Sequence, residues 1–580
     1  MSRTSILHVG VAATAAILVF TPARPGLRSG GPPPIESTTG MVVSVNGIAS
    51  DVGAAILAKG GNAVDAAVAT AFALAVVHPA AGNIGGGGFM IIRPPSGAAV
   101  AIDYREKAPL GSTRTMYLDS AGNIVRARTN TGYLAPGVPG TVRGLALAHR
   151  KFGRLPWKDV VAPATALAER GFVLSDSLAK SINREVARGM EPYPQSVKAY
   201  GKPGGEWKRG DTIVLADLGR TLRAIETHGP NEFYTGWIAD SIVATMTAGG
   251  GLISKNDLAR YAAVVRAPIR GTYRGYEIIS MPPPSSGGVA IVEMLNVLER
   301  YDLAKMGKQS AAAQHLIIEA QRRAYLDRAR FLGDMDFTPV PIKTLISKAH
   351  ATDVAASIER ARASRSVELG RDIVTVAEPH ESDETTHFSV IDKKGMAVSS
   401  TFTLEGGYGS HVVVSGAGFI LNNEMGDFNK KPSLTDTTGN IGTRPNEIAP
   451  GKRMLSSMSP TIVTRNGKLF LVTGSPGGRT IINTVLGVLL NTIDFGMDLR
   501  QAVDAPREDS EWLPDVATYE RNALPDSIVK ELEGMGHRIR IADGEQGDAH
   551  SIMYDFKART AYGANDLRSP DSKVSKPGKL

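Results

Sequence analysis

A threonine at the start of an alternating apolar segment has the most distinctive chemistry in the chain. Thr385 follows an acid-rich stretch (378–384) and leads through Thr386-His387 into Phe388-Ser389-Val390. Cleavage of the Glu384–Thr385 bond would place a free α-amine, with a pKa of about 7.7–8.0 in peptides, beside the Thr385 hydroxyl. A threonine activated by its own amine is a known nucleophile, so we hypothesise a self-cleaving amidohydrolase. The same residues also fit an ordinary strand start.

A nucleophile of this kind needs donors for an oxyanion. Thr473-Gly474-Ser475-Pro476-Gly477-Gly478 follows an expected strand and precedes an expected helix. The paired glycines could turn backbone N–H groups toward one point, where a tetrahedral oxyanion would lie. An ordinary strand–helix turn explains the same pattern equally well.

Polar residues that could anchor a substrate occur at three further places. Arg105, in Asp103-Tyr104-Arg105-Glu106, could hold a carboxylate with two parallel hydrogen bonds, although a surface arginine paired with Glu106 or Asp103 is the alternative. The segment 422–428 combines amides and acids suited to a cationic amine, and 456–461 supplies hydroxyls. Each segment alone would be routine loop chemistry.

The elements that must position these residues change character at Thr385. Before it we expect a strand at 41–45, helices at 50–59 (capped by Ser50) and 63–77 (capped by Asn62), a strand at 89–93 and mainly helices over 140–375. After it we expect strands at 385–391, 396–404, 410–414, 419–421, 461–465 and 468–472, then helices at 480–494 and 526–535. The glycine run 85–88 precedes a strand and lacks a following Lys-Ser/Thr, so it favours close backbone packing over phosphate binding.

The strands after Thr385 need helices from the earlier part of the chain to cover them. We therefore divide the folded chain into a large part, 40–384, and a small part, 385–580, which form one intertwined unit. The predicted fold class is α+β.

Composition excludes several classes of function. The 580 residues carry a formal charge of +8 with pI ≈ 9.3, but no Lys/Arg block and no interleaved aromatic residues occur, so we expect no nucleic-acid partner. Cysteine is absent, which excludes disulfides, thiolate catalysis and cysteine-ligated metals.

The first residues resemble an export signal. Arg3 precedes a nearly uncharged run from Val9 to Phe20, and Thr21-Pro22-Ala23 offers a small-residue cleavage site. We expect a signal peptide at 1–23 and a periplasmic or secreted location, with an uncleaved membrane anchor as the alternative. The Pro/Gly-rich residues 24–39 are expected to be a disordered linker.

Taken together, the motifs resemble those of the γ-glutamyltranspeptidase (γ-glutamyltransferase) family from about Gly40 to the C-terminal end. The segments that carry the resemblance are 60–67, 78–79, 85–88, 103–106, 136–140, 385–387, 422–428, 455–461 and 474–478. The resemblance implies a four-layer αββα N-terminal-nucleophile hydrolase, made as a precursor that cleaves itself before Thr385 into a heterodimer of two fragments.

The resemblance also implies roles for individual residues. Thr385 is the nucleophile and, through its amine, the base; Thr403 supports it, and Gly477 and Gly478 form the oxyanion hole. The remaining matches bind the glutamyl group: Arg105, Ser456 and Ser457 hold its α-carboxylate, Asp427 and Glu424 take its α-amine, and Glu405 is a further partner of the ammonium. No cofactor or metal is implied.

Two departures from the family pattern concern the pocket entrance. Gly426 replaces the first of two usual acids, while Asp427 is kept. Residues 429–452 correspond to a lid that often carries an aromatic gate, yet contain no aromatic residue. We therefore expect an open pocket in which hydrolysis dominates transfer.

The expected activity is attack by Thr385 on glutathione and other γ-glutamyl compounds, followed by transfer to water or to an amino-acid or peptide acceptor. A cephalosporin or glutaryl acylase of the same family is the first alternative. A non-enzymatic secreted binding protein that reuses the pocket is the second.

Overall fold

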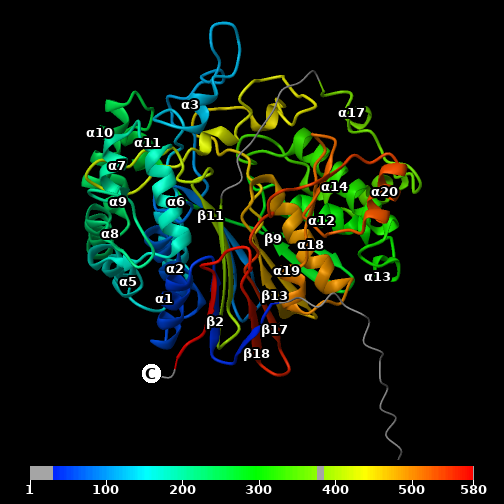
Figure 1. Cartoon of the computed structure of the whole chain (residues 1–580), viewed down its shortest axis with the longest axis horizontal. Coiled ribbons are helices and arrows are strands. Elements are labelled where there is room, and N and C mark those ends of the chain that lie inside the picture. The colour runs from blue at the N-terminus through cyan, green and yellow to red at the C-terminus, as the bar shows by residue number, and fades with distance from the viewer. Residues whose placement is uncertain (1–30, 375–384, 579–580) are drawn as a thin grey trace, which may run out of the picture.

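A computed structural model describes residues 31–374 and 385–578 of the chain. Two seven-stranded sheets lie face to face, and a layer of helices covers the outer face of each (Figure 1). The predicted four-layer α+β sandwich is therefore confirmed. The signal peptide predicted at 1–23 and the acidic segment 378–384 lie outside the described residues.

The first sheet carries the segment that begins at Thr385. Its strands run, from edge to edge, in the order β19 (Lys573–Ser575), β2 (Gly40–Ser44), β10 (Thr386–Asp392), β11 (Ala397–Thr403), β3 (Gly87–Arg93), β4 (Val100–Asp103) and β7 (Val264–Arg266). Neighbouring strands are antiparallel throughout. Strand β10 is held between β2 and β11, in the middle of the sheet.

The second sheet also mixes strands from both sides of residue 385. Its order is β1 (Ile35–Ser37), β18 (Thr560–Ala564), β17 (Ser551–Asp555), β13 (Lys468–Thr473), β12 (Thr461–Arg465), β9 (Tyr276–Ser280) and β8 (Ile269–Tyr273). Small sheets add β14 (Glu508–Ser510), β15 (Ala517–Tyr519) and β16 (Ile539–Ile541), and β5 (Phe172–Val173) with β6 (Thr212–Ile213). Both large sheets therefore need residues from before and after Thr385.

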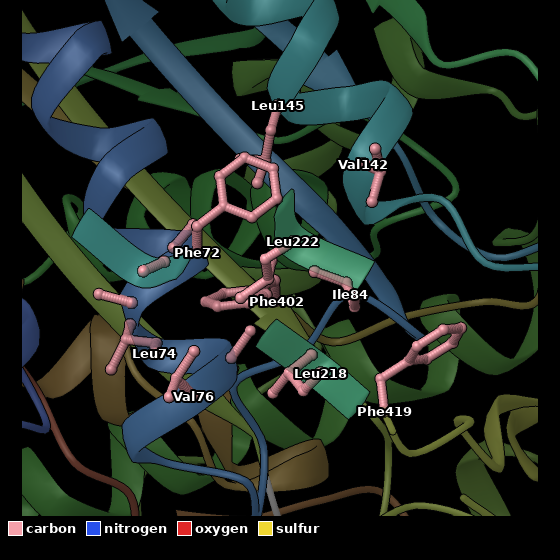
Figure 2. Packing of buried hydrophobic residues seen from close by; sticks show 14 of the residues in the cluster. Phe72, Leu74, Val76, Ile84, Val142, Leu145, Leu218, Leu222, Phe402 and Phe419 are labelled. Atoms are coloured by element: carbon pink, nitrogen blue, oxygen red, sulfur yellow. The ribbon is translucent and has the colours of Figure 1, made fainter. Parts of the chain in front are cut away.

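Helices from the first part of the chain cover the first sheet. They are α1 (Gly47–Ala58), α2 (Ala63–Val77), α4 (Thr141–Phe152), α5 (Trp157–Arg170), α6 (Asp176–Ala187), α7 (Pro194–Tyr200), α8 (Ala216–His228), α9 (Asn231–Thr235), α10 (Trp237–Ala248) and α11 (Lys255–Arg260). The short helix α3 (Arg126–Asn130) lies at one end of the sandwich (Figure 1). Helix α2 is buried on all sides, and Asn62 and Asp65 form a capping box at its start. In Figure 2, Phe72, Leu74 and Val76 of α2 pack near Phe402 of β11.

The second helix layer comes from both parts of the chain. It contains α12 (Gly287–Leu298), α13 (Leu303–Met306), α14 (Ala311–Phe331), α15 (Ile342–Leu345), α16 (Lys348–Ala356), α17 (Ser366–Leu369), α18 (Ile481–Ile493), α19 (Leu499–Asp504) and α20 (Asp526–Gly534). Helices α12, α14 and α18 lie on the opposite side of the sandwich from α2 (Figure 1). Three 3₁₀ turns, Glu424–Asp427, Arg444–Asn446 and Gly478–Thr480, lie in the connecting loops.

Side-chain alternation explains the layering. On β3, Met90 and Ile92 belong to the core under α2, whereas Phe89 and Ile91 belong to the core shared with the second sheet. Successive residues of a strand point to opposite faces. Because β3 is apolar on both faces, it needs cover from both sides, as the four-layer arrangement provides.

Most of the predicted elements are confirmed, but two details are wrong. Helix α1 begins earlier than predicted, because the Asn46 side chain, not that of Ser50, accepts the first N–H, from Ile48 at 3.0 Å. The strands predicted at 410–414 and 419–421 reduce to one bridge between Val413 and Ile420. A preceding turn with positive φ at Glu405, Tyr408 and His411 interrupts the extended backbone.

The linker predicted at 24–39 is also corrected in part. Residues 24–30 lie outside the described residues, but Ile35–Ser37 form β1 and pair with Ala561–Gly563 of β18. The strand satisfies the backbone groups at the edge of the second sheet, which would otherwise be open to other chains. Among the described residues, no helix combines the length and apolarity needed to cross a membrane.

The core beneath α2 gives a test of this packing. Phe402 is fully buried and meets Phe388 edge-on, with ring centroids 5.9 Å apart. Phe402→Ala should lower the free energy of unfolding by about 3–5 kcal/mol, measured as a lower midpoint in urea. Phe556→Ala is the control, since Phe556 is 49% exposed. Equal effects of the two substitutions would contradict the packing described.

Candidate active site

The register between β10 and β11 brings two predicted site residues together. Thr386 pairs with Phe402, so Thr385 stands opposite Thr403 just beyond the paired ends. The Thr403 hydroxyl donates to the Thr385 hydroxyl at an oxygen–oxygen distance of 3.5 Å. Thr403 itself accepts the backbone N–H of Glu405 at 2.8 Å. The second threonine thus has its proton directed at the first.

The backbone of Thr403 is fixed by a residue that the sequence analysis did not single out. Asn83 donates to the carbonyl of Thr403 at 2.8 Å and accepts the N–H of Gly86 and the hydroxyl of Thr141. A Cβ atom at Gly86 would lie 2.1 Å from the Thr403 carbonyl oxygen. The glycine run therefore allows a close backbone approach, as predicted, and this approach positions Thr403.

His387, close to Thr385, is engaged in the core and is not available as a base. Its ring nitrogens contact the hydroxyls of Thr401 at 2.8 Å and Ser389 at 3.1 Å. Complete burial lowers the pKa of His387 well below its ordinary value. The ring therefore stays neutral and cross-links the polar layer between the sheets.

The predicted oxyanion-hole glycines, Gly477 and Gly478, form a turn with an unusual backbone conformation. Gly477 (φ 126°) and Gly478 (φ 54°) both adopt positive φ, a conformation that L side chains rarely adopt. Among residues 31–374 and 385–578, no acceptor takes up the N–H of either glycine. Gly478 lines the same pocket as Thr385. The turn thus leaves two donors for an oxygen of a bound molecule.

Arg105 is a buried arginine, so the surface alternative is wrong. It is 1% exposed, and its guanidinium makes short ion pairs with Glu424 and Asp427. It also donates to the carbonyl oxygens of Met454 at 3.3 Å and Leu455 at 3.1 Å. Its guanidinium also lies 3.8 Å from the carboxylate of Glu106, whereas the Asp103 carboxylate pairs with Arg266 at 2.7 Å.

The carboxyl groups around Arg105 form one coupled electrostatic unit. Burial lowers the pKa of Arg105, but Glu424, Asp427 and Glu106 outweigh it and raise that pKa overall. Burial raises the pKa of Glu106 to about 8 and that of Glu424 well above its ordinary value, although Arg105 opposes both shifts. One positive charge therefore faces more carboxyl groups than it can keep ionised at neutral pH.

The predicted hydroxyl pair directly follows Leu455, whose carbonyl accepts from Arg105, and it contacts residues at the start of α12 and on α14. The backbone of Ser456 is held by Pro284 and Ser286, with N···O distances of 2.9 and 2.7 Å. The Ser457 hydroxyl accepts from Arg328 at 3.1 Å. Arg328, on α14, also donates to the Ser286 hydroxyl at 2.9 Å.

One pocket collects nearly all of the predicted site residues. It is lined by Thr385, Thr403, Glu405, Arg105, Glu424, Asp427, Ser456, Ser457 and Gly478. Gly477 is not among the lining residues but directly precedes Gly478 in the chain. Residues from before and after position 385 thus share one cavity, which combines a hydroxyl nucleophile candidate, a cation and several carboxyl groups.

The segment 429–452, called the lid segment here, forms one wall of this pocket. In Figure 1 it is the yellow loop at the end of the sandwich where α3 also lies. Thr443 donates to the carbonyl of Ala329 at 2.5 Å, and Arg479 donates to that of Gly439 at 3.2 Å. Within the lid, the buried Asp436 accepts the Thr438 hydroxyl at 2.7 Å. The lid segment is thus tied to α14 and to the turn after Gly478.

In the part of the chain that the structure describes, two clusters have ligand atoms close enough to hold a metal ion, but neither lines the pocket. They are Glu293, Asp327 and His350, and His315, Glu319 and His537. His350 already lies 3.0 Å from Asp327 and 3.4 Å from Glu293, and Glu319 is paired with Arg322 and Arg323. Internal ion pairs therefore account for both clusters, and the reaction pocket is built without them.

Two supporting residues, Asn83 and Arg328, were not among the predicted site residues. Asn83 is a single amide before the glycine run, and Arg328 has the appearance of a solvated helix residue. Asn422, the first residue of the predicted polar segment 422–428, is fully buried and bonds to Gly85, Gly137 and Glu424. The sequence signal that could have identified Asn83 is its amide, which stands alone in an apolar, glycine-rich stretch.

Known proteins resemble this chain in sequence and in fold. The family model described as gamma-glutamyltranspeptidase matches residues 49–575. The chain belongs to the γ-glutamyltranspeptidase family. It is 46% identical to the glutathione hydrolase proenzyme of Escherichia coli (strain K12), over 93% of this chain and 92% of that protein. It is 37% identical to the Acylase ACY 1 proenzyme of Pseudomonas sp. (strain SE83), over 94% of this chain and 95% of that one.

Solved structures agree with this family assignment. A cephalosporin acylase from Bacillus halodurans has a TM-score of 0.82 and 26% identity, covering 97% of this chain and 99% of its own. The Helicobacter pylori gamma-glutamyltranspeptidase has a TM-score of 0.54 and 45% identity, covering 55% of this chain and 91% of the matched one. The chain is thus similar both to glutathione hydrolases and γ-glutamyltranspeptidases and to acylases.

The raised pKa of Glu106 predicts a pH dependence of stability. The folded state keeps a proton on Glu106 that the unfolded chain releases above pH 4.5, so stability should fall as pH rises from about 4.5 to about 8. Glu106→Gln removes this contribution. Melting temperatures measured from pH 5.5 to 8.5 should decline less steeply for Glu106→Gln than for the wild type.

The matched control is Glu533→Gln, because Glu533 is exposed on α20. Its pH profile should follow that of the wild type. If Glu106→Gln also followed the wild type, Glu106 would be ionised in the folded protein throughout the range.

Proposed function

We propose that the chain is a γ-glutamyl hydrolase and transferase acting on glutathione and related γ-glutamyl amides. The observation that carries the proposal is the meeting of the hydrogen-bonded Thr385–Thr403 pair with the buried Arg105–Glu424–Asp427 cluster in one pocket. A threonine nucleophile accounts for acyl transfer, and a guanidinium beside carboxylates suits the carboxylate and amine of an amino-acid head group. The names of the relatives that share this family give independent support.

The proposed reaction begins with a cut between Glu384 and Thr385. The Thr385 hydroxyl attacks the Glu384 carbonyl, the peptide bond becomes an ester, and water opens the ester to leave a free Thr385 amine. That amine then takes the proton of the hydroxyl as the oxygen attacks the γ-carbonyl of the substrate. The same proton passes to the leaving amine, and an acyl-enzyme remains.

The second half of the proposed reaction releases the glutamyl group. Water or an amine attacks the ester and gives a proton to the Thr385 amine, which returns it to the threonine oxygen. The N–H groups of Gly477 and Gly478 stabilise the oxyanion in both halves. The Thr403 hydroxyl keeps the nucleophilic oxygen aligned, since it donates to that oxygen.

The substrate head group would exchange partners with the protein on binding. Arg105, together with Ser456 and Ser457, takes the α-carboxylate, while Asp427, Glu424 and Glu405 receive the α-amine. Because Arg105 is held by carboxylates in the structure, a zwitterionic ligand can replace one ion pair by two and leave the total charge of the site unchanged. Amino-acid or peptide acceptors and export by the N-terminal segment belong to the same proposal.

A cephalosporin or glutaryl acylase is the second candidate, favoured by the structural likeness to a cephalosporin acylase. A glutaryl or similar acyl group lacks an α-amine and has less need of Asp427 and Glu424. The pocket contains both acids, each paired with the buried Arg105. Their presence favours a γ-glutamyl substrate, which has an α-amine, over a glutaryl substrate, which has none. The lid segment has no aromatic residue. That hydrolysis dominates transfer to amines for this reason stays a prediction.

Self-cleavage gives the first test of this function. Thr385→Ala removes the attacking hydroxyl, so the purified variant should remain one full-length band on a denaturing gel while the wild type gives two. Thr386→Val is the matched control, because Thr386 is fully buried and its hydroxyl has no described partner. A smaller wild-type fragment that begins at a residue other than Thr385 would contradict the mechanism.

Substrate anchoring gives the second test. Arg105→Lys keeps a charge but loses the planar fork, and a charged hydrogen bond is worth about 1.5–3 kcal/mol. The variant should lose roughly one to two decades of kcat/KM for a γ-glutamyl anilide, mostly through KM, while self-cleavage continues. Arg209→Lys at an exposed position is the control. Unchanged kinetics would favour the acylase.

A further inference from the structure

The lid segment contributes two lysines whose charges the proposed reaction does not use. Lys430 and Lys431 both line the pocket that contains Thr385. Each is partly buried, not fully exposed. Among residues 31–374 and 385–578, no carboxylate lies within ion-pair distance of either ammonium group, and no acceptor is hydrogen-bonded to it. Two neighbouring positive charges thus face the cavity without a described counter-ion.

The acids of the same pocket are committed elsewhere. Asp427 and Glu424 are paired with Arg105. Of the other cations, Arg479 lies 3.0 Å from Glu511, and Arg328 donates to the hydroxyls of two serines. The lid lysines therefore differ from the other basic residues of the pocket, which have partners within the protein.

The glycine at position 426 explains part of this imbalance. A Cβ atom at Gly426 would lie 3.9 Å from Cε of Lys430, an ordinary contact distance. An acidic side chain there would lie beside the lysine, and Gly426 provides none. The missing acid leaves Lys430 available to an anion that enters the pocket.

We propose that Lys430 and Lys431 bind a carboxylate on the amine portion of the substrate, the part that leaves when the γ-glutamyl bond breaks. This inference rests on the proposed γ-glutamyl activity. The glutamyl head group has its own anchors around Arg105, so the lid cations serve the other side of the scissile bond. The favoured substrates are γ-glutamyl amides of amino acids and peptides, above all those whose leaving amine bears an accessible carboxylate.

The same contact applies to acceptors. A leaving amine and an attacking amine pass through the same tetrahedral arrangement in opposite directions, so they occupy the same place. An acceptor that carries a carboxylate should therefore gain from the same two lysines. Lys430 and Lys431 are specificity-determining residues in this scheme and do not touch the reacting atoms.

The experiment compares two donors that differ by one charge: γ-glutamyl para-nitroanilide, and the same anilide with a ring carboxylate beside the nitro group. The ratio of kcat/KM for the charged to the neutral donor is measured for the wild type and for Lys430→Gln, Lys431→Gln and the double variant. The ratio should fall roughly three- to tenfold in the double variant. In the wild type it should also fall as ionic strength rises.

Comparing ratios removes the electronic effect of the ring carboxylate, because that effect is the same in every variant. Lys158→Gln on α5 is the control, since Lys158 is exposed outside the pocket; it should keep the wild-type ratio. An unchanged ratio in the double variant, with both donors still cleaved, would overturn the proposal and leave the γ-glutamyl activity standing.

A binding measurement separates this proposal from the activity itself. The charged leaving group alone, an aminonitrobenzoate, is titrated into wild type and double variant by calorimetry. Weaker binding to the double variant supports the anion site even if neither anilide is cleaved. Equal binding to both proteins would overturn it.

Discussion

The pairing of β10 with β11 is the interaction on which the site depends. Their antiparallel register sets Thr385 opposite Thr403, and a shift of β10 by one residue would turn Thr385 toward the helix layer, away from Thr403. The register is fixed on both sides, because β2 pairs with the other edge of β10 and β3 with the other edge of β11. Phe388 and Phe402, packed under α2, hold the opposite face. The position of the Thr385 hydroxyl relative to that of Thr403 is thus fixed by the pairing of four strands.

The buried charges around Arg105 impose a second constraint. Removing a guanidinium and several carboxyl groups from water is costly, and partners recover the cost only when their geometry is good. Here the carbonyl groups of Met454 and Leu455 and the acids at 424 and 427 all converge on one side chain. Buried ion pairs often stabilise a fold no more than well-packed apolar residues of similar volume would. The proposed zwitterionic substrate would offer this cluster one partner of each charge.

Local signals in the sequence predicted the elements well where the cause is local. Asn62 and Asp65 specify the start of α2, and the period of two specifies β10 and β11. The strands predicted at 410–414 and 419–421 are wrong. Hydropathy does not reveal the positive φ at His411, inside the first of them, or at Glu405 and Tyr408 just before it.

The site was predictable mainly through its resemblance to a family, since its contacts join distant parts of the chain. Asn83 reaches Thr403 across 320 positions, and Arg328 reaches Ser457 across 129. No periodicity encodes such pairs. The charge state of Glu106 likewise depends on complete burial, which its motif does not reveal.

Both large sheets contain strands from before and after residue 385, and this affects how the protein can fold before and after cleavage. An intact chain can fold by a unimolecular reaction, with every strand of both sheets on one polymer. After a break before Thr385, the same sheets would have to be rebuilt from two separate molecules, so refolding would depend on concentration and slow with dilution. The cleaved protein would then be kinetically stable: it would stay folded because its unfolding barrier is high, after folding as one chain before the cut.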